Sequence, residues 1–136
     1  MNISQEHRKF LVQEFRYAAS KMIEVQDPRV KLYFFSATFA HINRIMNLEF
    51  EPQLAFSYFV LNAVYATING RVSSPPEPGI VIPDRLFEAL ISATEDYTDR
   101  LERNQDTYDV LERFANLAYA TTGNGNYLYQ KGLLTI

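Results

Sequence analysis

The stretch from Pro52 to Gly70 reads PQLAFSYFVLNAVYATING and contains no charged side chain. Proline is favoured in the first turn of a helix, and Asn69-Gly70 is a good C-terminal stop, so one helix is predicted over about 51–69. A helix without a charged face has no obvious side to give to water. We therefore expect protein to enclose it.

Two apolar seams run along this predicted helix. The first keeps helical steps of +4, +3, +4 and +3 and consists of Leu54, Tyr58, Leu61, Tyr65 and Ile68. The second lies on roughly the opposite side and consists of Phe56, Phe59, Ala63 and Ala66. Two seams on one helix predict that it is packed between two layers.

Four further helices are predicted because apolar residues recur there at helical spacing. They span about 4–26, 28–47, 84–103 and 106–121. The connection Leu48-Glu49-Phe50 is short, which favours an antiparallel hairpin of 28–47 and 51–69 at the centre of the fold. The sequence thus predicts an all-α, five-helix bundle without a sheet.

The domain organisation follows from length and from the breaks between helices. At 136 residues the chain is expected to form a single helical domain over 1–136. A Pro-rich connector is predicted at 71–83, and an apolar tail at 122–136 is expected to dock on another surface.

The surplus of apolar helix surface predicts a homo-oligomer, with a two-fold dimer as the expected form. Enclosing both central helices on all sides needs more helices than the chain supplies. The partner interface is assigned to Leu54, Tyr58, Leu61, Tyr65 and Ile68, because tyrosines suit surfaces that meet both protein and water. A compact monomer with this seam under the last two helices is the alternative.

Composition argues against several functional classes. The chain has no cysteine, so disulfides, thiolate nucleophiles and Cys-based metal sites are excluded. Its bases are spread along two helices without a dense patch, which gives no strong signal for nucleic-acid binding. The start of the chain lacks the apolar core of a secretory signal, and polar insertions argue against a membrane span at 52–70. A cytoplasmic location is expected.

Two acidic pairs provide the main candidate for metal chemistry. Asp96/Asp99 and Asp106/Asp109 each have i, i+3 spacing, which lets two carboxylates reach one Mg²⁺. A small Mg²⁺-dependent helical nucleotide hydrolase is the corresponding hypothesis. Helix capping and solubility explain the same residues, and no metal site is assigned.

The two histidines do not indicate a metal site. His41 lies on the apolar side of its helix and has no ligating residue three or four positions away, so a buried structural histidine is expected. His7 is expected to be solvated. An apolar-ligand pocket near Tyr58, Tyr65 and His41 is a further hypothesis.

No nucleophile constellation or phosphate-binding loop occurs in the sequence. No catalytic residue and no cofactor are therefore assigned. The leading expectation is a non-enzymatic assembly or interaction protein that acts as a homodimer and has a further, unidentified protein partner as an open alternative.

Overall fold

The computed structural model describes residues 1–74 and 77–136, and these residues form six α-helices and no strand. The helices are α1 (Gln5–Glu24), α2 (Pro28–Met46), α3 (Pro52–Ser73), α4 (Leu86–Glu102), α5 (Tyr108–Tyr119) and α6 (Gly123–Gln130). The predicted all-α fold is confirmed. The predicted count of five is wrong, because part of the tail forms α6.

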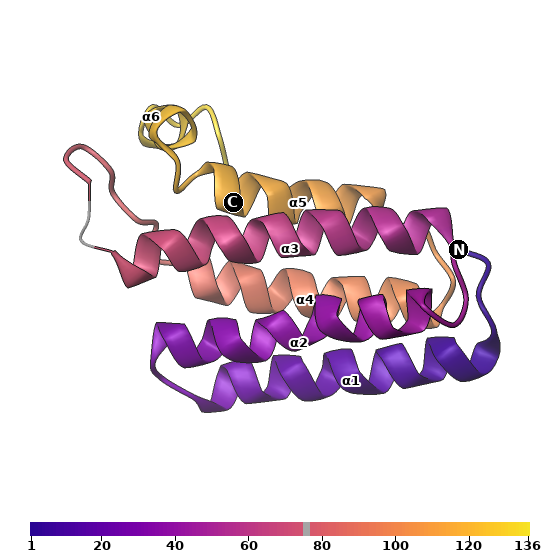
Figure 1. Ribbon diagram of the computed structural model, residues 1–136. Helices are drawn as coiled ribbons and strands as arrows, with labels where there is room; N and C mark the ends of the chain where they lie inside the picture. Colours follow the sequence, from indigo (N-terminus) through magenta and orange to yellow (C-terminus); the bar gives the residue numbers. More distant parts are fainter. Residues whose placement is uncertain (75–76) are drawn as a thin grey trace.

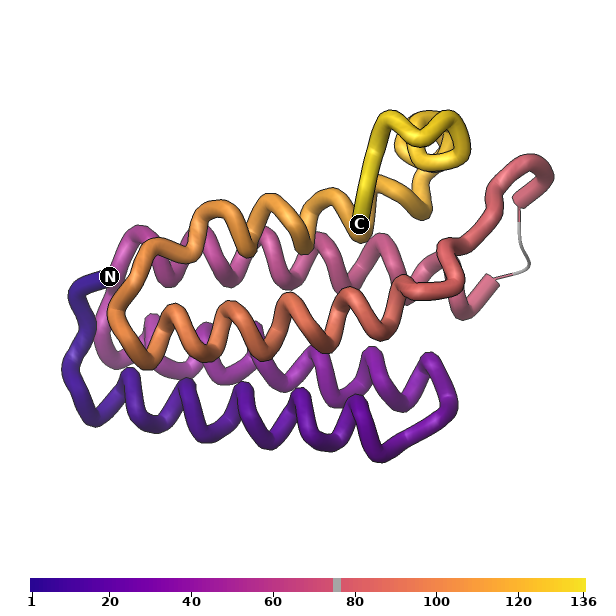
Figure 2. Tube along the Cα trace, turned by 180° about the vertical axis from the view of Figure 1, so that it is seen from behind, coloured from indigo at the N-terminus to yellow at the C-terminus, as the bar shows by residue number. Residues whose placement is uncertain are grey.

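The first five helices pack side by side along their lengths (Figure 1). Their contacts close a ring. Around this ring the order is α1, α2, α3, α5 and α4, so α5 separates α3 from α4 along the outside. Neighbours in the sequence run antiparallel, whereas α3 and α5 run in the same direction (Figures 1 and 2). The predicted hairpin of α2 and α3 is present as two adjacent members of the ring, and side chains fill the centre of the bundle.

Large aromatic and aliphatic side chains fill the core. Phe15 of α1 stacks on Tyr97 of α4 with ring centroids 5.2 Å apart. Phe35 of α2 packs against Phe114 of α5 at 5.9 Å. All four rings are almost completely buried, so every helix around the ring except α3 contributes an aromatic anchor.

Polar groups at the helix ends connect elements that are distant in the sequence. Arg8 is buried, and its guanidinium donates to the backbone oxygens of Leu101 and Met1, both at 2.8 Å. A cation is favourable at the C-terminus of a helix, where backbone carbonyls lack helical partners. Arg8 therefore joins the start of α1 to the end of α4.

The expected stop at Asn69-Gly70 is wrong. Helix α3 continues through Gly70 and ends at Ser73, because a single helical glycine lowers helix stability without forcing a break. The predicted connector at 71–83 therefore contains the last turn of α3. Helix α4 begins at Leu86 after a turn closed by the backbone N–H of Leu86 and the oxygen of Pro83, so Asp84 is not its N-cap.

The C-terminal segment turns back onto the bundle. Thr122 caps α6 by accepting a hydrogen bond from the backbone N–H of Gly125. Asn126 and Gln130 of α6 bind the backbone of the connector at Val81 and Gly79. The connector and α6 lie together at one end of the molecule (Figure 2). The end of the chain then returns to α4 and α5, where Ile136 and Leu117 line the same hollow.

Candidate protein–protein interface

The first seam of α3, which the sequence assigned to a partner, points mainly into the bundle. Leu54, Leu61 and Ile68 have no exposed surface. Tyr58 and Tyr65 are half-buried and pack against Phe39 of α2, with ring centroids 6.2 and 5.5 Å apart. In this conformation only the two tyrosines of the seam are open to a partner.

The second seam of α3 faces outward. We call it the α3 outer seam, and it consists of Pro52, Phe56, Phe59, Ala63, Ala66 and Gly70, all exposed. Its spacing alternates between +4 and +3 along the whole helix. Phe59 is 66% exposed and Phe56 is 48% exposed. An uncharged stripe with two open phenylalanines has the composition of the centre of an interface.

Helix α5 extends this apolar face. The ring of Tyr108 stacks on Phe56 with an interplanar angle of 10° and a centroid distance of 6.4 Å. Tyr119 is exposed near the other end of α5. The two helices run parallel and in contact, so their outer sides form one continuous surface, the α3–α5 face.

Three hollows follow the groove between α3 and α5. One lies at the start of the helices beside Phe56 and Tyr108, with a volume of about 340 Å³. A smaller one, about 180 Å³, lies beside Val60 and Ala115. The third is about 290 Å³ and is lined by Val60, Ala63, Val64, Thr67, Ala115, Ala118, Tyr119 and Thr122. Concave apolar positions of this kind accept side chains of a packed partner.

The electrostatics of this face are simple. Among the described residues that line the three hollows, the charged ones are Asp106 and Glu112. Both are acidic and lie toward the N-terminal half of α3, near Phe56. Arg71 lies in the last turn of α3, where it pairs with Glu77. The face therefore has a neutral middle, an acidic end and an arginine near the opposite end.

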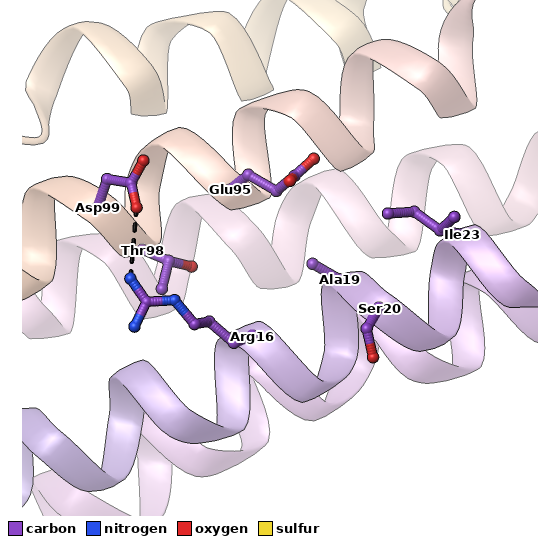
Figure 3. A pocket seen from close by; sticks show the side chains of 7 residues that line it. All are labelled: Arg16, Ala19, Ser20, Ile23, Glu95, Thr98 and Asp99. Atoms are coloured by element: carbon purple, nitrogen blue, oxygen red, sulfur yellow. Dashed lines mark hydrogen bonds and ion pairs between the residues drawn. The ribbon is translucent and has the colours of Figure 1, made fainter.

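A different type of hollow lies between α1 and α4 (Figure 3). Its volume is about 260 Å³, and Ala19 and Ser20 contribute to one side. Arg16 reaches across toward α4 and pairs with Asp99 at 3.4 Å and Glu102 at 2.8 Å. The hydrogen bond to Glu102 is the main cause that raises the pKa of Arg16. The ion pairs of Arg16 bridge this hollow, whereas the charged residues that line the α3–α5 groove, Asp106 and Glu112, are both acidic.

The four aspartates proposed for Mg²⁺ are engaged by arginines and by the backbone. Asp96 pairs with Arg113 at 2.5 Å, and Asp109 pairs with Arg100. Asp99 binds Arg16 as described above, while Asp106 accepts a hydrogen bond from the backbone N–H of Tyr108 at 3.0 Å. Within residues 1–74 and 77–136, no three His, Cys, Asp or Glu residues come together as metal ligands.

The three residues of the hypothetical ligand pocket do not converge. His41 faces α1: its Nε2 lies 3.2 Å from a carboxylate oxygen of Glu14, and its ring meets Phe10 edge-on at 5.3 Å. Its Nδ1 lies 2.9 Å from Arg44, so His41 has two polar partners. Partial burial lowers the pKa of His41, and Arg44 adds to this while Glu14 opposes it.

His7, predicted to be solvated, takes part in a polar contact between two elements. Its Nδ1 lies 2.6 Å from Glu49 in the α2–α3 connection. Both carboxylate oxygens of Glu49 also accept from the backbone N–H of Ser4, at 2.9 and 3.0 Å. These bonds, led by the one from Ser4, lower the pKa of Glu49. The contact spans 42 residues and was not visible in the local sequence pattern.

Comparison with protein-family models, with curated proteins and with solved structures finds no match for this chain. None of the helices in the described ranges combines the length and hydropathy that a membrane span requires.

The sequence predicted both seams of α3 and assigned the partner contact to the first one, which is mostly buried here, while the second is exposed. The signal that distinguishes them is residue size. Leucine and isoleucine recur in the seam that is buried, while alanine and glycine occupy half of the seam that is exposed. Small side chains let another backbone approach closely, which is a property of an interface rather than of a wide core.

Proposed function

We propose that this protein is a non-enzymatic assembly protein that acts as a homodimer and that the α3–α5 face joins the two copies. The exposed, uncharged α3 outer seam is the observation that supports this proposal most directly. A contiguous apolar face costs little to desolvate, and a second copy of the same chain is the commonest partner of such a face. The cytoplasm remains the proposed compartment.

The state of the candidate catalytic groups favours an assembly role over hydrolysis. Asp96, Asp99 and Asp109 form ion pairs with arginines, and Asp106 accepts a hydrogen bond from the backbone at the start of α5. Both histidines contact carboxylates of other elements. These contacts give each group a structural task in the monomer.

Light scattering coupled to size exclusion tests the proposal. The wild-type protein is expected to have about twice the monomer mass of 15.7 kDa at micromolar concentration. Phe59→Asp places a charge in the middle of the seam and is expected to give a monomer with unchanged helical circular dichroism, because Phe59 makes little contact with the core.

A matched control is available on another face. Tyr33 of α2 is an exposed aromatic residue outside the α3–α5 face, so Tyr33→Asp is expected to leave the dimer intact. Leu61→Asp does not distinguish loss of the dimer from loss of the fold, because Leu61 is buried and its replacement unfolds the monomer. A wild-type mass near 15.7 kDa would overturn the proposal.

A further inference from the structure

Residue size changes along the α3 outer seam. The N-terminal half carries Phe56 and Phe59, and the C-terminal half carries Ala66 and Gly70. Ala63 lies next to the midpoint of the helix, which runs from Pro52 to Ser73. The N-terminal end of the seam therefore carries two large aromatic side chains, and the C-terminal end carries only small residues.

We infer that the two copies pack their α3 helices antiparallel, with Ala63 on the two-fold axis and each Phe59 on the partner's Ala66. This inference rests on the proposed dimer. An antiparallel two-fold places the end of each seam that has large side chains on the end of the other seam that has small ones. Phe56 then meets the partner's Gly70. Such alternation of large and small side chains lets facing helices interdigitate at the density of a protein interior.

The charges favour the same direction. Glu112 lines the groove beside Phe56 and Val60, toward the N-terminal half of α3. Arg71 lies in the last turn of α3. An antiparallel dimer brings the Glu112 of one copy to the end of the interface that holds the partner's Arg71–Glu77 ion pair, which carries no net charge. Parallel pairing instead brings the two acidic ends together.

The sizes of the facing side chains also disfavour parallel pairing. With the two-fold along the helix axes, phenylalanines would meet phenylalanines at one end, and alanines and glycines would face each other at the other end. Helices held apart by four aromatic rings cannot close around small side chains, so a void would remain.

Cysteine cross-linking measures the register directly, because the natural sequence has no cysteine. A disulfide needs Cα atoms about 4.4–6.8 Å apart. In the antiparallel dimer Ala63→Cys places each thiol beside its twin, and mild oxidation is expected to convert most of the protein to a covalent dimer. Ala66→Cys is the control, because its twin is displaced by about 9 Å along the axis.

The outcomes are distinct. Cross-linking of Ala63→Cys but not of Ala66→Cys supports the antiparallel register. Efficient cross-linking of both indicates the parallel arrangement and overturns the inference. A dimer by mass in which Ala63→Cys does not cross-link also overturns it, while the proposed dimer stands. A monomeric wild-type protein overturns the proposed function itself.

The contact between Phe59 and the partner's Ala66 has its own test. Ala66 is exposed in the monomer, so Ala66→Trp fills the space that Phe59 needs without disturbing the core. This variant is expected to raise the dimer dissociation constant about tenfold, as loss of a packed aromatic anchor does. Asn124→Trp in the exposed start of α6, outside the α3 outer seam, is the control. An unchanged dissociation constant for Ala66→Trp would overturn the contact between Phe59 and Ala66.

Discussion

Two hydrogen bonds join the side chain of Asn126 to the backbone of Val81. The backbone N–H of Val81 donates to Oδ1 of Asn126 at 2.9 Å, and Nδ2 of Asn126 donates back to the oxygen of Val81 at 2.7 Å. The same Nδ2 also donates to the oxygen of Ala120 at 2.8 Å. One buried side chain therefore fixes the connector between α3 and α4 against α6.

Replacing Asn126 by Ala is expected to lower the free energy of unfolding by about 2–3 kcal/mol, because four hydrogen bonds lose their side-chain partner, including the one that Oδ1 accepts from Nε2 of Gln130. Thermal or chemical denaturation measures the loss, and hydrogen exchange should increase at the amide of Val81. Asn124→Ala in the exposed first turn of α6 is the control. Unchanged exchange at Val81 in Asn126→Ala would contradict this role.

Gly125 is required by the close approach of α6 to the end of α5. A Cβ atom at this position would overlap the backbone carbonyl of Tyr119, which cannot rotate away. Gly125→Ala is expected to destabilise the protein by about 1–3 kcal/mol. Gly123→Ala meets open space in the same helix and should be neutral or stabilise by about 0.5–1 kcal/mol. Equal melting temperatures for the two variants would refute the steric explanation.

The hydroxyl of Tyr97 is fully buried and has no hydrogen-bond partner among the described residues. An unsatisfied buried polar group costs about 1–3 kcal/mol, so Tyr97→Phe is expected to preserve or increase stability while keeping the stacking on Phe15. Chemical denaturation of the two proteins at neutral pH provides the comparison. A loss above about 1 kcal/mol would show that the hydroxyl is bonded in solution.

Tyr97 also predicts a dependence on alkaline pH. Burial raises the pKa of Tyr97 to about 12 from its ordinary value of 10.0, and the nearby Ser57 offsets part of this effect. The unfolded chain therefore releases this proton first, and stability is expected to fall as the pH rises from 10 toward 12. Tyr97→Phe should remove this part of the decline. A parallel decline in both proteins would assign it to other groups.

Glu49 predicts the response to acid. Hydrogen bonds from the Ser4 backbone and from His7 lower the pKa of Glu49 below its ordinary value of 4.5. Its contribution to stability is therefore complete above that ordinary value and is lost as the pH falls through the lowered one. Glu49→Gln should lower the melting temperature at neutral pH and flatten its acid dependence. Glu95→Gln on an exposed part of α4 should keep the wild-type slope.

Periodicity and breaks in the sequence were enough to locate α1 to α5 to within a few residues. Each of these helices has apolar residues at regular helical spacing, and Asp27-Pro28 and Glu51-Pro52 mark two helix starts that the structure shows. Helix α6 was missed because Gly-Asn-Gly-Asn has low intrinsic helix propensity. Its formation depends on the Thr122 cap and on the bonds of Asn126, which involve a segment 45 residues away.

The choice between the two seams of α3 could not be made from local pattern. Both seams are apolar, both follow the same period, and no charge marks the outer side. The choice depends on where α5 packs, and that position is set by contacts between residues far apart in the chain. Similarly, the hydrogen bond from Arg8 to the backbone oxygen of Leu101 joins residues 93 positions apart, and the local sequence around either residue does not predict it.

The position of α5 beside α3 has a consequence for synthesis of the chain. Helix α3 leaves the ribosome after α2, but its other neighbour, α5, is made only after the connector and α4. At about 5–20 residues per second, a nascent chain presents both apolar sides of α3 incompletely covered for seconds. During that interval we expect the nascent α3 to be open to chaperones and to premature contact between chains on neighbouring ribosomes.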